Sequence, residues 1–292
     1  MKSVDVVCDH KSELGEGPVW DESKGVICWI DILNGHIHEW SIENKVLNTI
    51  KVDQMIGAVT ITDDEQYLAA LQHGFAFVNR KNGALQIIAD PEDHLSENRF
   101  NDGKCDPAGR FWAGTMPLSE DKASGSLYVL NKDRSIDKKE DNITISNGLA
   151  WDVKEKAFYY IDTPTLKVVR YDYDMSTGTI TNKRTIIHVP KAAGFPDGMT
   201  IDREGMLWIA HWGGWQVTRW NPNTGEMLTS FKLPVSNVTS CAFGGNFLND
   251  LYITSAKKGL SDEELKQQPL AGSLFVIPNC GYTGLVANKY KG

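Results

Sequence analysis

The sequence has no long apolar run and no excess of basic residues, and each absence excludes a class of protein. No stretch approaches the roughly 18 consecutive apolar residues that a membrane-spanning helix needs. Residues 1–10 lack the apolar core and the small-residue cleavage site of a secretory signal peptide. The formal net charge is −8 over 292 residues, and no basic stripe is present to neutralise phosphates. We therefore expect a cytoplasmic protein that binds neither nucleic acid nor a membrane.

Cysteine is sparse, and its spacing argues against a covalent or cysteine-based metal framework. The chain has five cysteines, an odd number, and no two of them form a CxxC pair. They lie far apart in the sequence, at Cys8, Cys28, Cys105, Cys241 and Cys280. Disulfide frameworks and cysteine zinc sites usually depend on even numbers or on close pairs. We therefore expect these cysteines to be reduced thiols.

Helical periodicity is also scarce. Only residues 261–268, SDEELKQQ, have the pattern of a short helix, with Ser261 as a possible N-cap and acidic residues in the first turn. Elsewhere, short aromatic and β-branched segments such as 25–31 and 206–212 alternate with turn sequences such as DPAG and NPNTG. This pattern predicts an all-β protein.

What the sequence does contain is internal repetition. Five segments begin with a glycine, continue through a few apolar residues, turn, and resume as an apolar strand. Their starting glycines lie 40 to 50 residues apart, at Gly17, Gly57, Gly103, Gly148 and Gly198. A weaker sixth copy begins near Ser240. A period of this length, with about four short strands in each copy, is typical of a β-propeller blade.

Six such copies predict a six-bladed β-propeller with four-stranded antiparallel blades. No linker rich in Pro, Gly or Ser interrupts the copies, which predicts a single domain over residues 1–292. A propeller has to close its ring, and residues 3–9, SVDVVCD, are the candidate strand that pairs with the last copy. A β-sandwich or two small barrels are the main alternative, but the regular period favours the propeller.

Polar residues precede the starting glycine in four of the six copies. They are Glu16, Asp102, Asn147 and Asp197, whereas the second copy has Ile56 at this position. Equivalent positions in different blades face the same part of the central channel. We therefore expect these oxygen-bearing side chains to converge at one end of the channel, although they are far apart in the sequence.

A second set of acids follows each of these strands and begins turn sequences. It consists of Asp21, Asp106, Asp152 and Asp202. At about 3.3 Å per residue, these side chains lie at the opposite end of the strand from the first set. An aspartate at the start of a turn commonly accepts hydrogen bonds from the turn amides. We therefore predict a structural role for this second set.

The convergent set has the chemistry of a metal site. Carboxylates that face one another repel unless a cation compensates them or one becomes protonated. Glu16, Asn147 and Asp197 offer only hard oxygen ligands, which suit Ca²⁺, Mg²⁺ or Mn²⁺. The alternative is that Asn147 and Asp197 merely cap tight turns before glycine. The match across repeats favours a site for one divalent ion, Ca²⁺, Mg²⁺, Mn²⁺ or Zn²⁺.

Residues near Asp102 are candidates for binding a substrate at the same end of the channel. Arg99 and Asn101 share one face of an extended segment, so both can point toward a ligand, although Arg99 could instead pair with Asp102. The polar loop 117–125, PLSEDKASG, could cover the pocket. Glu120 in this loop is a further candidate substrate contact, with a solvated surface role as the alternative.

Five sequence motifs lie in order over nearly the whole chain: LGEGPVWD, NRFNDGKCDPAGRFWAGTM, SNGLAWD, PDGMTID and GLSDEELKQQPLAGSLF. Together they resemble the motifs of the senescence marker protein/regucalcin/gluconolactonase family. The resemblance implies a six-bladed propeller with a divalent metal ion in its axial channel. It also implies an enzyme that hydrolyses sugar lactones.

The resemblance assigns roles to individual residues. It implies that Glu16, Asn147 and Asp197 are metal ligands, in agreement with the set chosen from the repeats. It implies that Asp197 is the catalytic base and that Arg99 and Asn101 hold the substrate. Asp102 is not a usual ligand in the family, so we expect it to support the ligands from behind.

The resulting hypothesis is a metal-dependent lactonase that acts on a sugar lactone as a monomer or weak dimer. Two other functions remain open. One is hydrolysis of another ester or an organophosphate in the same metal pocket. The other is a calcium-binding regulatory protein without lactonase activity. The two carboxylates and one amide are fewer charged ligands than a tight calcium site normally gathers, which favours the enzyme.

Overall fold

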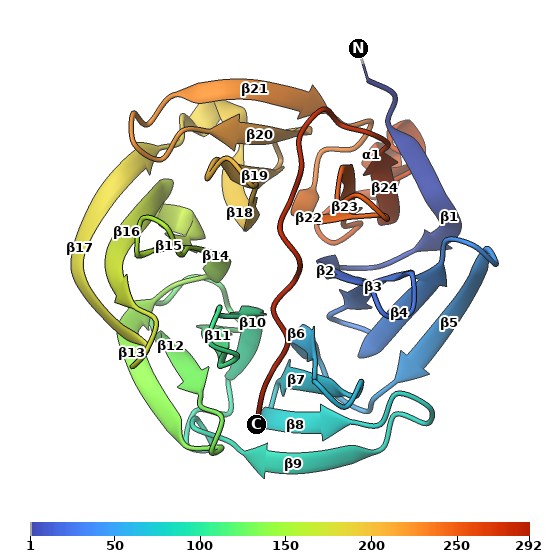
Figure 1. The fold of residues 1–292 in the computed structure, drawn as a ribbon. Helices are drawn as coiled ribbons and strands as arrows, with labels where there is room; N and C mark the ends of the chain where they lie inside the picture. Colours follow the sequence, from blue (N-terminus) through green and yellow to red (C-terminus); the bar gives the residue numbers. More distant parts are fainter. Residues whose placement is uncertain (1) are drawn as a thin grey trace.

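The computed structural model describes residues 2–292, and its strands form six sheets around a central channel (Figure 1). Each sheet has four antiparallel strands, and each is one blade of a ring. The predicted six-bladed β-propeller is therefore confirmed. In chain order, blades 1 to 5 are β2–β5, β6–β9, β10–β13, β14–β17 and β18–β21, and blade 6 consists of β22, β23, β24 and β1.

The strands occupy equivalent places in each blade. The innermost strands, beside the channel, are β2 (Gly15–Asp21), β6 (Ile56–Ile61), β10 (Asn98–Cys105), β14 (Ser146–Asp152), β18 (Phe195–Ile201) and β22 (Val238–Gly244). The second strands are β3 (Val26–Asp31), β7 (Tyr67–Leu71), β11 (Phe111–Pro117), β15 (Ala157–Asp162), β19 (Leu207–Trp212) and β23 (Asp250–Ser255).

The two outer positions are filled in the same way. The third strands are β4 (His36–Ser41), β8 (Gly74–Val78), β12 (Gly125–Leu130), β16 (Lys167–Asp174), β20 (Gln216–Trp220) and β24 (Ser273–Ile277). The outermost strands are β5 (Val46–Lys51), β9 (Leu85–Ala89), β13 (Ile136–Ile143), β17 (Thr179–His188), β21 (Met227–Lys232) and β1 (Asp5–Lys11). The hydrophobic cores lie between adjacent blades, for example where Trp112 contacts Phe158.

The N-terminal strand closes the ring. β1 pairs antiparallel with β24, with Asp5 opposite Val276 and Val6 opposite Phe275. One blade is thus built from both ends of the chain, as the sequence predicts. This arrangement ties the first blade to the last and leaves β22 and β23 to complete the sixth sheet.

Every innermost strand has a register shift beside the starting glycine of its repeat, or at the matching place in the sixth copy. The shifts lie between Glu16 and Val19, Ile56 and Ala58, Phe100 and Gly103, Asn147 and Leu149, Pro196 and Met199, and Val238 and Ser240. A β-bulge bends a strand and re-aims the side chains next to it. The bulges therefore explain why a polar residue directly followed by glycine recurs at one level of the channel.

Two of these glycines show why no larger residue fits. A Cβ atom on Gly57 would lie 2.3 Å from the carbonyl carbon of Phe100 in the next blade. A Cβ atom on Gly148 would lie 2.6 Å from Ile161 and 2.9 Å from the backbone oxygen of Asp197. The innermost strands therefore approach one another too closely for a side chain, and this close approach brings the polar residues beside the glycines together.

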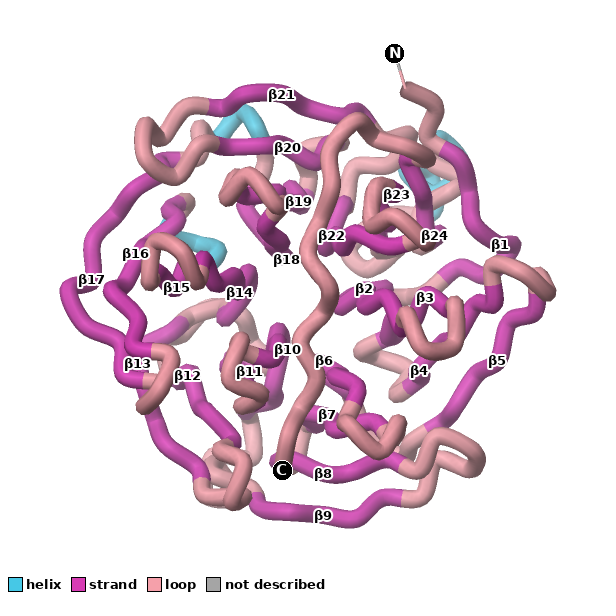
Figure 2. Tube along the Cα trace, viewed as in Figure 1, coloured by secondary structure: helices cyan, strands magenta, loops and turns pink. Residues whose placement is uncertain are grey.

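After β24 the chain crosses the face of the ring at one end of the channel (Figures 1 and 2). Tyr290 forms backbone hydrogen bonds with Ile61 and Asp63, and Lys291 donates to Gly109. The backbone amide of Arg203 donates to Thr283 on the same segment. Residues 283–291 therefore connect blades 2, 3 and 5 and cover this end of the channel.

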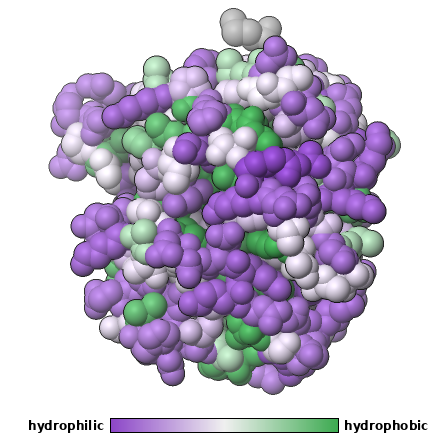
Figure 3. All heavy atoms as spheres, turned by 90° about the vertical axis from the view of Figure 1, so that its left-hand side faces the viewer, coloured by the Kyte–Doolittle hydropathy of each residue, from purple (hydrophilic) through white to green (hydrophobic). Residues whose placement is uncertain are grey.

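Helical structure is confined to short pieces. The α-helix α1 (Asp262–Gln267) begins at Ser261, which forms a capping box with Glu264, so the predicted helix is confirmed. The 3-10 helices are η1 (Thr163–Thr165) and η2 (Lys191–Ala193). No helix within residues 2–292 is long and apolar enough to cross a membrane. The side of the ring that carries β13 and β17 is largely hydrophilic (Figure 3).

Candidate metal and substrate site

One cavity of about 240 Å³ brings all of the sequence-predicted site residues together. It lies at the level of the bulges in the innermost strands. Among the residues that line it are Glu16, Arg99, Asn101, Glu120, Asn147 and Asp197. These residues come from blades 1, 3, 4 and 5. Their predicted roles as ligands or substrate contacts remain predictions, but they do share one pocket.

The two carboxylates of the predicted metal set are buried and repel each other. Burial and, to a smaller extent, the nearby charge of Asp102 together raise the pKa of Glu16 to about 8. Burial also raises the pKa of Asp197 well above its usual value, with the charges of Glu16 and Asp102 as further causes. Each carboxylate accepts a hydrogen bond from the amide of the next glycine, Gly17 or Gly198.

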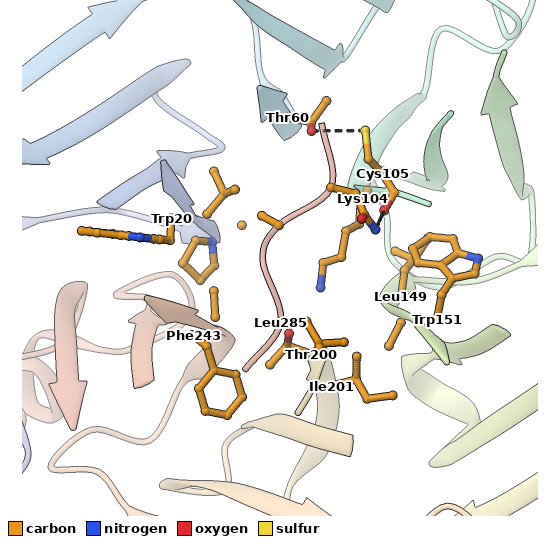
Figure 4. A pocket seen from close by; sticks show the side chains of 18 of the residues that line it. Trp20, Thr60, Lys104, Cys105, Leu149, Trp151, Thr200, Ile201, Phe243 and Leu285 are labelled. Carbon is orange, nitrogen blue, oxygen red and sulfur yellow. Dashed lines mark hydrogen bonds between the residues drawn. The ribbon is translucent and has the colours of Figure 1, made fainter. Parts of the chain in front are cut away.

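Asp102 faces the inside of the channel, behind the pocket that Glu16, Asn147 and Asp197 line. It lines a second cavity of about 170 Å³ inside the channel, between the site and the crossing C-terminal segment. Lys104 also points into this cavity (Figure 4) and donates to the backbone oxygen of Met199, with 2.6 Å between the two atoms. Burial lowers the pKa of Lys104, and the charge of Asp102 opposes that shift. The structure thus places Asp102 behind the site pocket, where the sequence predicts a supporting residue.

A threonine that the sequence reasoning missed fixes the orientation of Asn147. The hydroxyl of Thr163 donates to the backbone oxygen of Pro196 at 2.8 Å. It therefore accepts a hydrogen bond from the side-chain amide of Asn147, also at 2.8 Å. The amide nitrogen of Asn147 faces Thr163 in this arrangement, and its oxygen is left to face Asn101 and the pocket. Thr163 lies in η1, outside the repeated glycine positions, so no spacing signal marks it.

Arg99 has no carboxylate partner in the described part of the chain. Its guanidinium donates to the backbone oxygen of Phe100 at 2.9 Å and to the side-chain oxygen of Asn101 at 2.8 Å. Burial lowers its pKa to about 10, although Glu120, Glu16 and Asp197 oppose the shift. The alternative pairing of Arg99 with Asp102 is not observed. A buried guanidinium without a paired anion is suited to bind a ligand oxygen.

Asn101 connects the predicted substrate residue to the predicted metal ligand. Its side-chain oxygen accepts from Arg99, and its nitrogen donates to the backbone oxygen of Ser146 and to the side-chain oxygen of Asn147. Both donors of the Asn101 amide are therefore used within the protein. Asn101 holds Arg99 and Asn147 in place, and only its oxygen has a remaining lone pair for a substrate.

Glu120 lies at the mouth of the pocket and pairs with Lys258. The side chain of Glu120 is 40% exposed and that of Lys258 is 31% exposed. The predicted loop 117–125 therefore does reach over the pocket. The sequence reasoning did not identify Lys258, because nothing in its spacing connects it with a residue 138 positions earlier.

Aromatic and aliphatic side chains form the remaining wall of the pocket. They include Leu14, Ile32, Ile145, Phe195 and Trp212. A pocket with an apolar wall and a few convergent polar groups is the usual form of a small-molecule site. The wall can pack against the carbon skeleton of a ring while the polar groups bind its oxygen atoms.

The second set of aspartates has the predicted structural role. Asp21, Asp106, Asp152 and Asp202 each accept a hydrogen bond from a backbone amide in the following turn. Three of them do more than the sequence predicts, and the first, Asp21, also binds the side chains of Ser23 and Arg80. Asp106 also binds the side chains of Arg110, Trp112 and Tyr173, and Asp202 binds those of Trp208 and Arg219.

The donor set fits a hard divalent cation. Within residues 2–292, no three His, Cys, Asp or Glu side chains form a metal-binding group by themselves, so a site here depends on the amide oxygen of Asn147. Burial raises the pKa values of Glu16 and Asp197, and repulsion between these two carboxylates and Asp102 adds to the shift. A cation at this position would remove the repulsion and keep both carboxylates ionised.

The fold and the pocket define a six-bladed propeller with an oxygen-rich axial site. Residues 14–257 match the family model described as SMP-30/Gluconolactonase/LRE-like region, and the chain belongs to this family.

Individual relatives agree with this assignment. The chain is 40% identical to the Bacillus subtilis protein named "Putative sugar lactone lactonase YvrE", over 91% of both chains. It is 39% identical to regucalcin of Danio rerio over the whole of both chains. A solved structure of regucalcin from Agrobacterium tumefaciens, described as a calcium-binding protein, superposes with a TM-score of 0.94. It is 28% identical and covers 99% of this chain and 97% of that chain. The family and the relative named as a sugar lactone lactonase support a hydrolase of the lactonase type.

Proposed function

We propose that this protein is a metal-dependent lactonase that opens aldonolactones, such as gluconolactone, to the corresponding aldonic acids. The observation that carries the proposal is the convergence of Glu16, Asn147 and Asp197 in one pocket with the unpaired guanidinium of Arg99. Membership of the gluconolactonase family supports the reaction class. The apolar wall supports a substrate with a carbon ring.

In this proposal Glu16, Asn147 and Asp197 hold one divalent ion, which supplies Lewis acidity at the lactone carbonyl when it is bound. The carboxylate of Asp197 takes a proton from the water molecule that attacks the carbonyl carbon. The bond between this carbon and the ring oxygen breaks, and the ring oxygen takes the proton back from Asp197 to become a hydroxyl group. The product is an aldonate, so water is the only co-reactant.

The remaining residues hold and orient the substrate. Arg99 donates to the oxygen atoms on which negative charge develops, because its guanidinium is buried and lacks an anionic partner. Asn101 keeps Arg99 at this place. Glu120 accepts from substrate hydroxyl groups at the mouth of the pocket. No covalent nucleophile is needed, because a lactone of this kind is a reactive ester.

The test is a matrix of lactones and metal ions with the wild type and Asp197→Ala. Acid release from several aldonolactones is followed with Mg²⁺, Mn²⁺, Zn²⁺ and Ca²⁺. We expect turnover in the wild type and a loss of about 10²-fold or more in Asp197→Ala, because the variant loses a ligand and the base. Wild-type rates in the variant, or after chelation, would contradict the mechanism. Simple esters and organophosphates in the same matrix test the other hydrolase functions.

A second candidate function is calcium binding without catalysis. It is favoured by the hard oxygen donors of the pocket and by the relatives named regucalcin. This function predicts tight and selective Ca²⁺ binding without turnover of any lactone in the matrix. The proposed enzyme instead predicts that Ca²⁺ is one of several ions that bind and that at least one ion supports hydrolysis.

A further inference from the structure

The mouth of the pocket is crossed by one ion pair between opposite blades. Glu120 lies in the loop between β11 and β12 of blade 3, and Lys258 follows β23 of blade 6. Blades 3 and 6 face each other across a six-bladed ring (Figure 1). Both side chains line the pocket, so the pair forms a charged cover over it.

The backbone of Lys258 is fixed from both sides. Its amide donates to the backbone oxygen of Glu13, and its carbonyl oxygen accepts from the side chain of Asn237, each at 3.0 Å. The adjacent Lys257 points to a different partner, because its ammonium group pairs with Glu13 at 3.2 Å and it does not line the pocket. Lys258 therefore presents its ammonium group to the mouth from a rigid base.

The loop that carries Glu120 is anchored to neighbouring segments only at its ends, and within the loop the amide of Glu120 donates to the backbone oxygen of Pro117 at 3.1 Å. At one end the amide of Leu118 donates to the backbone oxygen of Glu97 at 2.8 Å. At the other end Asn98 and Ser124 exchange two hydrogen bonds of 3.0 Å each. Between these anchors, the contact with Lys258 is the one side-chain link from the described loop to another blade. The position of the Glu120 carboxylate over the pocket thus depends on Lys258.

We propose that Lys258 is a specificity-determining residue that selects lactones with several hydroxyl groups. It positions Glu120 over the pocket, and the two side chains together offer a donor and an acceptor to hydroxyl groups of the substrate. A ligand that enters under the pair displaces water from both charged groups. A polyhydroxylated lactone replaces those hydrogen bonds, whereas a lactone without hydroxyl groups leaves them unmade. This inference rests on the proposed lactonase function.

The experiment compares two lactones of the same ring size, glucono-δ-lactone and δ-valerolactone, which lacks hydroxyl groups. For Lys258→Met we expect the KM for gluconolactone to rise about tenfold with kcat nearly unchanged, because the lost contacts bind substrate and transition state alike. The kcat/KM for δ-valerolactone should stay at the wild-type value. Lys258→Arg should recover most of the affinity. Lys257→Met is the matched control and should behave as the wild type.

Two results would overturn the inference. One is a KM for gluconolactone in Lys258→Met that equals that of the wild type. The other is an equal loss on both lactones, which indicates general loosening of the pocket. If the wild type hydrolyses neither lactone, the proposed function fails, and calorimetric titration with gluconate then decides the role of Lys258. About tenfold weaker gluconate binding in Lys258→Met supports the role, and equal binding contradicts it.

Discussion

Single side chains decide whether the pocket can hold a cation. Sequence spacing predicts that Glu16, Asn147 and Asp197 share one place in the channel, and the structure puts them in one pocket. Spacing does not predict which way the amide of Asn147 points. That orientation depends on Thr163. Its hydroxyl proton is directed to the backbone oxygen of Pro196, so the hydroxyl oxygen can only accept from Asn147. Residues that orient a metal ligand commonly matter almost as much as the ligand itself.

Replacing Thr163 should weaken metal binding without removing a ligand. In Thr163→Val the amide of Asn147 loses its partner and can rotate, so we expect about 10- to 100-fold weaker binding of the divalent ion. Thr163→Ser keeps the hydroxyl group and should bind the ion nearly as well as the wild type. Isothermal titration of the metal-free proteins measures both affinities. Equal affinities in Thr163→Val and the wild type would show that Thr163 does not orient the ligand.

A buried histidine should contribute to loss of stability in acid. His38 is fully buried, and its Nδ1 atom lies 2.9 Å from the hydroxyl of Thr49. Burial lowers its pKa to about 3, and the neighbouring His10 and His36 contribute. Because the unfolded chain binds a proton below about pH 6.5 and the folded chain does not, His38 lowers the free energy of unfolding as the pH falls. The slope is about 1.4 kcal/mol per pH unit.

His38→Gln isolates this effect, because glutamine does not titrate. Urea unfolding at several values between about pH 7.5 and pH 5 should give a shallower decline in the free energy of unfolding for the variant than for the wild type. Parallel curves for the two proteins would show that His38 does not drive the decline. Comparing the difference between the proteins removes the contribution of the carboxylates, which titrate in both.

The innermost strands explain why glycine recurs beside the site. A bulge at each starting glycine aims the preceding side chain, and the glycine itself allows the neighbouring blade to approach. The sequence shows the glycines and their period, but it does not show the bulges. Gly57 has the same structural function in a blade without a polar site residue. The glycine is therefore required for packing between blades, whether or not a site residue precedes it.

Gly57→Ala should therefore destabilise the fold strongly. The added methyl group would lie 2.3 Å from the carbonyl carbon of Phe100, and this neighbour is a backbone atom that cannot rotate away. We expect a loss of about 3 kcal/mol or more in the free energy of unfolding. Gly25→Ala is the control, because no atom lies within 4 Å of its added methyl group and only its φ of 62° opposes the change. Its cost should be about 1 kcal/mol. Similar losses for the two variants would contradict the close-approach argument.

The ring as a whole depends on both ends of the chain. The repeat predicts six blades, and the need for closure predicts that the N-terminal strand joins the last blade. The path of residues 283–291 across the channel carries no repeat or motif, so the sequence does not reveal it. The same holds for Lys258, whose contact with Glu120 joins opposite blades. Contacts of this kind depend on how the ring closes, and local patterns cannot specify them.

The crossing segment should protect thiols inside the channel. Cys105 and Cys241 line the inner cavity together with Leu285, and burial raises the pKa of Cys241 to about 12. We expect both thiols to be inert to a thiol reagent in the full chain and to react after removal of residues 283–292. Circular dichroism establishes that the shortened protein remains folded, and serine replacement of each cysteine assigns the reaction. Equal protection in the shortened protein would show that the segment does not seal the channel.

The central claim is that oxygen atoms from three blades hold one divalent ion that lactone hydrolysis requires. The most direct measurement is titration of chelator-treated protein with a divalent ion while aldonolactone hydrolysis and bound metal are followed together. We predict no turnover without metal and a rise in activity that ends at one bound ion per chain. We also predict that Asn147→Ala shifts this titration to higher metal concentration. Full turnover in the metal-free protein, or activity that does not follow occupancy of a single site, would contradict the claim.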